Sequence, residues 1–141
     1  MTFFVDANVI VYAALDGEYH DACVELLEAI VDGADGRTSP PVLEEVWHIE
    51  RSGRLGRLDG LAARAHKIFS PLLPVTDEAF ARALLIDAPQ LGTNDRVHVG
   101  TCFVHGIGTI ATADRGFDAA TALRRVDPLD TAARKRLLRS R

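Results

Sequence analysis

Two short apolar segments that each run into an aspartate constrain the fold of this chain most strongly. Thr2 to Val5 precedes Asp6, and Ile107 to Thr112 is followed by Ala113 and Asp114. Both segments are typical of short buried strands, and helical periodicity fills much of the sequence between them. A carboxylate at the end of a buried strand loses solvation, and this costs free energy unless another group compensates it. The pattern therefore indicates an α/β fold in which both aspartates need partners.

Apolar segments and helical patterns alternate along the whole chain. We expect strands at residues 2–6, 37–39, 72–76, 107–112 and 125–127, and helices at residues 8–15, 19–31, 41–52, 58–70, 76–87, 94–105 and 116–124. Strands separated by helices form parallel sheets, because the chain must cross back before it can add the next strand. The order predicts one α/β domain, residues 1–141, with a short central parallel sheet covered by helices.

The composition excludes several classes of protein. The 141 residues are 48% hydrophobic with a net charge of −4, which is typical of a globular protein and argues against a general coat for nucleic acid. No apolar segment reaches the roughly 20 residues of a membrane span, and the N-terminus lacks the basic region of a signal peptide. Cys23 and Cys102 lie in apolar helical patterns without CxxC spacing. We expect a cytoplasmic protein with both cysteines in its core.

The carboxyl ends of parallel strands line one crevice, so Asp6 and Asp114 should face the same site. Three further acids lie where they can join this site, namely Glu45, Asp95 and Asp118. Taken singly, each acid is explained as a helix cap, a turn former or a solvated side chain. Their joint arrangement favours a common chemical role.

Crowded carboxylates repel each other and raise each other's pKa values, and a divalent cation removes that penalty. Oxygen ligands without cysteine suit Mg²⁺ or Mn²⁺. Such a cation lowers the pKa of a bound water and neutralises charge on a phosphate, as phosphodiester hydrolysis requires. The acids therefore predict a metal-dependent phosphodiesterase site.

Four segments taken together resemble the PIN-domain ribonucleases, and among them the VapC-type toxins of bacterial toxin–antitoxin pairs. The segments are VDANVIVYA (5–13), SPPVLEEVWHI (39–49), NDRVHVGTCFVHGIGTIATADRGFD (94–118) and RRVDP (124–128). The resemblance implies a three-layer α/β/α sandwich and a Mg²⁺-dependent endoribonuclease that cuts RNA, often tRNA or rRNA. It also implies a small antitoxin partner and a homodimer.

The same resemblance assigns roles to individual residues. It implies four catalytic acids, Asp6, Glu45, Asp95 and Asp114, and a set of metal ligands, Asp6, Asp95, Asp114 and Asp118. Asn8 and Thr112 match polar positions beside the site. The segment VLEEVW offers Glu44 as well as Glu45, and Glu45 fits better because Val46 and Trp47 follow it.

Two basic stretches interrupt the acidic surface. One contains Arg51, Arg54, Arg57, Arg64 and Lys67, and the other is the C-terminal segment RKRLLRSR (134–141). Local basic surfaces of this kind support phosphate binding on an acidic protein, so we expect both to contact RNA. The simpler interpretation is a solvated helix face and a frayed tail.

Three other interpretations compete with the nuclease. Glu45 with His48 and Asp95 with His98 have the i, i+3 spacing of di-iron bundles, but the helices are too short. We expect the histidines to pack between helices, with His98 a candidate phosphate contact. A receiver or dehalogenase-like domain needs a lysine after a later strand, and only Lys67 and Lys135 are present. A PIN-like binding module without catalysis stays open.

Overall fold

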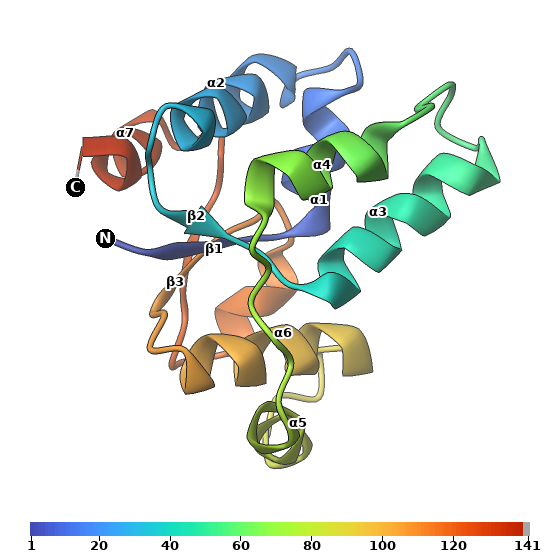
Figure 1. The fold of residues 1–141 in the computed structure, drawn as a ribbon. Helices are drawn as coiled ribbons and strands as arrows, with labels where there is room; N and C mark the ends of the chain where they lie inside the picture. Colours follow the sequence, from blue (N-terminus) through green and yellow to red (C-terminus); the bar gives the residue numbers. More distant parts are fainter. Residues whose placement is uncertain (140–141) are drawn as a thin grey trace.

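The computed structural model describes residues 1–139 and places four parallel strands in one central sheet (Figure 1). The strands are β1 (Phe3–Val5), β2 (Gly36–Arg37), β3 (Thr109–Ala111) and β4 (Arg124–Val126). Their spatial order is β2-β1-β3-β4. Phe4 of β1 is aligned with Ile110 of β3, so the two strands end at the same edge of the sheet.

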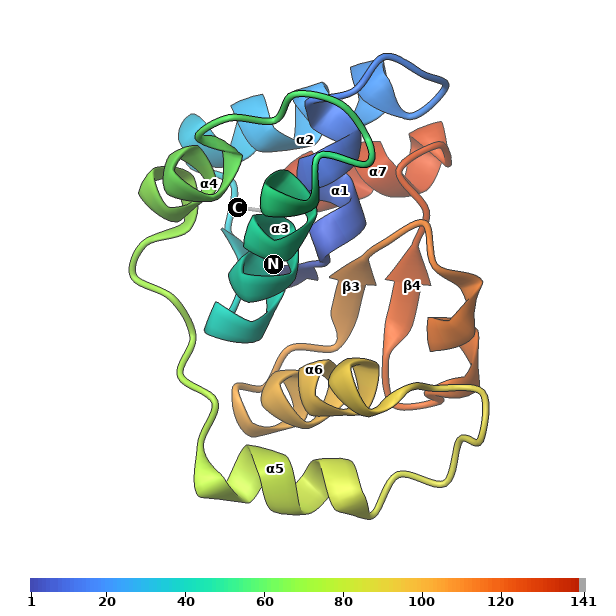
Figure 2. The same cartoon turned by 90° about the vertical axis from the view of Figure 1, so that its right-hand side faces the viewer.

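Helices cover both faces of this sheet (Figures 1 and 2). On one side lie α1 (Ala7–Ala13), α2 (His20–Val31), α3 (Pro40–Ser52), α4 (Leu61–Phe69) and α7 (Thr131–Arg139). On the other side lie α5 (Asp77–Leu84) and α6 (Thr93–Val104). The architecture is the expected three-layer α/β/α sandwich. No helix among residues 1–139 is both long and apolar enough to cross a membrane.

The first strand is buried on both faces, which explains its uninterrupted apolar sequence. Phe3, Phe4 and Val5 are each 0% exposed, as is Ile110 in the neighbouring strand. A parallel strand between two helix layers has no solvent face, so it needs no alternation of polar residues. The predicted strands at 2–6 and 107–112 are therefore confirmed, with shorter bounds.

The predicted strand at residues 72–76 is wrong. Within the described residues this segment forms no strand, although the Leu73 N–H donates to the carbonyl of Thr38, just after β2, at 2.9 Å. Pro71 and Pro74 flank this position and have no N–H to donate to a ladder. The segment instead crosses from α4 on one face to α5 on the other (Figure 2).

The C-terminal part of the chain also differs from the prediction. Residues 116–124 form only a 3-10 helix, η1 (Arg115–Ala119), before β4 begins at Arg124. The basic segment expected as a tail is mostly the helix α7, and residues 140–141 lie outside the described residues. Arg134 is buried there and donates to Glu25 of α2 at 2.9 Å. The Asp130 side chain, which accepts from the Ala133 N–H, caps this helix.

The two helices below the sheet pack at very short range because α6 contains a glycine at the contact. A Cβ atom placed on Gly100 would lie 2.2 Å from the Ala79 carbonyl oxygen of α5. Cys102, two residues further along α6, is completely buried, and burial raises the pKa of its thiol to about 12. Cys23 is likewise a buried free thiol, so both cysteines are core residues as expected.

Candidate active site

Asp6 follows β1 and caps helix α1, and both of its carboxylate oxygens are engaged. One oxygen accepts the Ala7 N–H at 2.8 Å. The other accepts the Thr112 hydroxyl at 2.7 Å and the Asn8 amide at 3.2 Å. The residue is only 4% exposed. These contacts offset much of the desolvation cost of a carboxylate at a strand end.

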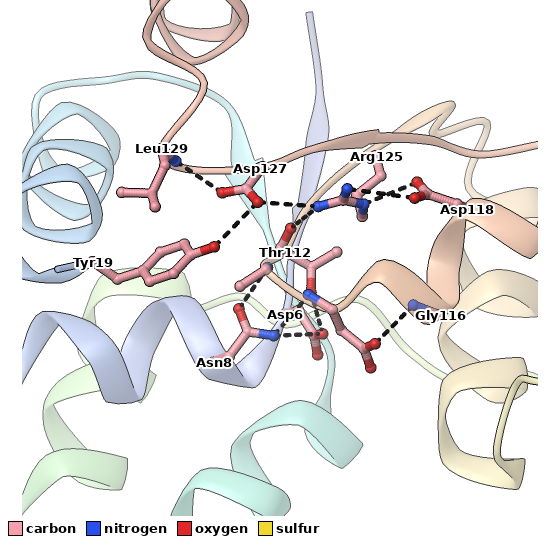
Figure 3. A network of polar contacts seen from close by, with 11 residues as sticks. Asp6, Asn8, Tyr19, Thr112, Gly116, Asp118, Arg125, Asp127 and Leu129 are labelled. Atoms are coloured by element: carbon pink, nitrogen blue, oxygen red, sulfur yellow. Dashed lines mark hydrogen bonds and ion pairs between the residues drawn. The ribbon is translucent and has the colours of Figure 1, made fainter. Parts of the chain in front are cut away.

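Thr112 connects the ends of β1 and β3, the two strands that carry the aspartates (Figure 3). Its hydroxyl donates to Asp6 and accepts from the Asn8 amide at 2.8 Å and from the Asp114 N–H at 3.0 Å. The Asn8 side-chain oxygen accepts the Ala113 N–H at 3.1 Å. The loop that carries Asp114 is therefore fixed to the start of α1 by a fully used hydroxyl. Both polar residues lie beside the acids, where we expected them.

Four acids from four different segments line one cavity of about 220 Å³. Asp6 comes from the end of β1, Glu45 from α3, Asp95 from the first turn of α6, and Asp114 from the loop after β3. The hydrophobic side chains of Val11, Tyr12, Ile49 and Leu55 form much of the remaining wall. The four acids named from the sequence are thus brought together in space.

The crowding of these acids raises the pKa of Asp95 to about 7. Desolvation is the largest cause, followed by repulsion from Asp6, Asp114 and Glu45. The pKa of Glu45 is raised by desolvation first and then by Asp6 and Asp114. Glu45 is exposed by surface area, but the protein around its carboxyl group still displaces part of its water. Negative charge thus accumulates here at a free-energy cost that a cation would relieve.

The oxygen-rich donor set fits a divalent cation. Among residues 1–139, one carboxylate oxygen each of Asp6 and Glu45 and one ring nitrogen of His98 lie within 4.8 Å of one another. Asp95 and Asp114 line the same cavity and add two more carboxylates. His98 belongs to α6, is completely buried and is not among the residues that line the cavity, so only its ring nitrogen reaches the acids from behind the wall. Burial lowers the pKa of His98 despite the charge of Asp6. The i, i+3 spacing of Asp95 and His98 was the feature of the sequence that indicated a position near this acid.

Asp118 is not among the residues that line the cavity. In η1 it faces Arg125 of β4, whose guanidinium donates to its two carboxylate oxygens at 2.9 and 3.4 Å (Figure 3). This hydrogen-bonded pair holds the pKa of Asp118 below its usual range. Arg125 also donates to the Thr112 carbonyl and to Asp127, each at 3.3 Å. Arg125 therefore links Asp118 to the backbone of Thr112, the residue that follows β3.

The other candidate residues lie outside the cavity wall. Glu44 is exposed and does not line the cavity, whereas Glu45 does. The candidate RNA-binding residues are all exposed on the end of α3, the following loop and α4, namely Arg51, Arg54, Arg57 and Lys67. Leu55, which lines the cavity, belongs to the same loop. A part in RNA binding stays a prediction for this basic surface.

The parallel sheet excludes the four-helix di-iron bundle, and the acids at its carboxyl edge define a nuclease-like α/β domain. The chain matches the PIN domain family over residues 3–123 and belongs to that family. PIN domains are generally nucleases, and they typically use divalent metals. No curated protein matches the chain.

Proposed function

We propose that this protein is a metal-dependent endoribonuclease that hydrolyses phosphodiester bonds in RNA. The observation that carries the proposal is that Asp6, Glu45, Asp95 and Asp114 line one cavity. Desolvation there, followed by repulsion from the other three carboxylates, raises the pKa of Asp95 to about 7. An arrangement that costs free energy in the absence of a ligand is typical of a functional site. Membership of the PIN family supports the choice of a nuclease.

In this proposal Asp6, Glu45, Asp95 and Asp114 hold Mg²⁺, for which Mn²⁺ can substitute. When bound there, such a cation would supply a water of lowered pKa and would offset negative charge on the phosphate. The protein contributes orientation, because Thr112 and Asn8 fix the carboxylate of Asp6 before any ligand arrives. Preorganised groups of this kind do not have to be rearranged during the reaction.

Asp118 has a different role in the proposal from the one that the resemblance implied. Its carboxylate forms a salt bridge with Arg125, and the same guanidinium donates a hydrogen bond to the Thr112 carbonyl. We therefore propose that Asp118 positions the loop that carries Asp114 and does not have to contact the cation.

The biological role proposed is that of a cytoplasmic VapC-type toxin, with residues 1–141 acting as one nuclease unit. Its partners would be tRNA or rRNA as substrate, a cognate antitoxin, and a second copy of the chain in a homodimer. The support for this part is the resemblance of segments 5–13, 39–49, 94–118 and 124–128 to that class of toxin.

The test is RNA cleavage by the purified, partner-free protein. A total-RNA pool is incubated with Mg²⁺, with Mn²⁺ and with EDTA, using the wild type, Asp95→Asn and Asp118→Asn. We expect discrete cuts that need a cation, that Asp95→Asn abolishes and that Asp118→Asn reduces only in part.

Cutting that persists in EDTA would contradict a metal-dependent reaction. RNA that binds but is never cut, with equal affinity for wild type and Asp95→Asn, would favour the alternative of a binding module. Far-UV circular dichroism of each variant verifies that its fold is retained.

A further inference from the structure

We propose that His98 supplies a nitrogen ligand to the cation held by Asp6 and Glu45, so that the site prefers a first-row transition ion such as Mn²⁺ over Mg²⁺. This inference rests on the proposed metal site and adds a ligand of a different chemical class to it. It concerns the identity of the cation, which the carboxylates alone leave open.

The distances between the three donor atoms support a shared cation. One oxygen each of Asp6 and Glu45 and one nitrogen of His98 all lie within 4.8 Å of one another. Divalent cations bind such atoms at about 2.0–2.2 Å, so two ligands of one ion are up to about 4.4 Å apart. Small side-chain shifts close this difference, and Glu45, on the exposed side, is free to make them.

The imidazole of His98 is buried, and its hydrogen bonding is incomplete. The residue is 0% exposed, and its Nδ1 atom has no hydrogen-bond partner among residues 1–139. Its Nε2 atom lies 3.4 Å from the Asn94 amide, at the outer limit of a hydrogen bond. The ring packs against Phe4 with centroids 5.5 Å apart. A buried imidazole with such incomplete hydrogen bonding costs free energy, and a metal ligand bond from one of its nitrogens would reduce that cost.

The helix α6 fixes this imidazole relative to the acids. His98 lies one turn after Asp95 on α6, and Gly100 lets this helix approach α5 closely. The Phe4 ring that packs against the imidazole belongs to β1, the strand that ends at Asp6. The ring is thus held by α6 and β1, the elements that position Asp95 and Asp6. A set of two carboxylates and one imidazole favours transition ions over Mg²⁺, which prefers oxygen ligands and retains several waters.

The test uses pulsed EPR on Mn²⁺ bound to the whole chain of residues 1–141. Electron spin echo modulation from a directly coordinated ¹⁴N nucleus should appear in the wild type. Labelling with ¹⁵N-histidine should replace that modulation with the ¹⁵N signal, and this result requires no substitution that could disturb the core. His98→Gln should abolish the modulation, while the matched control His48→Gln, an exposed histidine one turn after Glu45, should retain it.

The affinity for two cations gives a second measurement. His98→Gln should weaken Mn²⁺ binding by about tenfold or more, the loss seen even when a group behind a ligand is removed. Mg²⁺ binding should change much less, so the preference for Mn²⁺ should fall.

The outcomes separate this inference from the function proposed above. Mn²⁺ that binds without any histidine modulation would overturn the assignment of His98 and leave the carboxylate site standing. Mn²⁺ that does not bind at all would overturn both proposals.

Discussion

At the residue scale, Asp6 shows why a carboxylate can follow a buried strand. From the sequence we expected a cation to compensate the charge of Asp6, but its carboxylate also accepts three hydrogen bonds from within the chain. The cap on α1 and the link to Thr112 would be present with no metal bound. Asp6 therefore has a structural part as well as its proposed catalytic one, and variants at this position disturb both.

The hydroxyl of Thr112 can be tested apart from the acids. Thr112→Val removes the donor to Asp6 and the acceptor for the Asp114 N–H, so we expect unfolding to cost about 1–3 kcal/mol less. Cation affinity should also fall, because Asp6 loses its orientation. The control is Thr101→Val, an equally buried threonine that donates only within α6. Denaturant unfolding and Mn²⁺ titration measure both effects, and equal cation affinity in all three proteins would contradict the role of Thr112.

The raised pKa of Asp95 predicts a pH-dependent gain in stability on substitution. Its folded-state pKa of about 7 lies above its unfolded value, so the folded protein retains the proton more strongly and loses stability as pH rises toward 7. Asp95→Asn should remove this loss. We expect a gain of about 2 kcal/mol at pH 8, half of the full linkage energy because the residue is only partly buried.

The gain at pH 4 should be small, since Asp95 is then largely protonated when folded and the linkage cost is nearly absent. Thermal or urea unfolding without divalent cations, at pH 4 and pH 8, measures the difference. A gain that is the same at both values would show that the charge of Asp95 is not its cause.

At the element scale, the short parallel strands and the helices that follow them were predictable from the sequence, and their bounds shifted by only a few residues. Apolar runs that end in aspartate are informative because both the core and the site require them. The segment 72–76 has the hydrophobicity of a strand, but Pro71 and Pro74 prevent regular pairing. The helix α7 was not predicted, because its basic residues indicated a solvated tail. Two features favour a helix there, namely the cap at Asp130 and the apolar Leu137, which is buried.

The close contact between α5 and α6 predicts a strong effect of one methyl group. Gly100→Ala would normally favour a helix by about 1 kcal/mol. Here the added Cβ would lie 2.2 Å from the Ala79 carbonyl oxygen, so we expect a net loss of about 2 kcal/mol or more from overpacking.

The control for this substitution is Gly108→Ala, where the added Cβ has no neighbour within 4 Å. That variant should remain within about 0.5 kcal/mol of the wild type. Urea unfolding of both variants measures the difference, and an equal or increased stability of Gly100→Ala would contradict the tight contact.

At the scale of the whole molecule, charge is divided between an acidic cavity and an exposed basic surface close to it. The acids were predictable as a set because strand ends of a parallel sheet converge, whereas the position of His98 against Asp6 depends on how α6 packs on the sheet. Periodicity does not reveal such packing distances. The basic surface was visible in the sequence, and its contact with RNA stays a prediction.

The salt dependence of RNA binding tests this basic surface. The double variant Arg54→Glu/Arg57→Glu should bind single-stranded RNA more weakly. The slope of log affinity against log salt concentration should become shallower by about 1–2. The control is Arg82→Glu with Arg124→Glu, on α5 and β4. Fluorescence anisotropy at several salt concentrations measures RNA binding by both variants. An unchanged slope in the first variant would contradict RNA binding by this surface.

Equilibrium binding of Mn²⁺ to the wild type, Glu45→Gln and Glu44→Gln at neutral pH tests most directly whether the crowded acids form a cation site. The two glutamates are adjacent in α3, but only Glu45 lines the cavity with Asp6, Asp95 and Asp114. We expect Glu45→Gln to weaken Mn²⁺ binding by about tenfold or more, and Glu44→Gln to bind Mn²⁺ as the wild type does. Equal binding by all three proteins would show that the crowded acids are not a cation site.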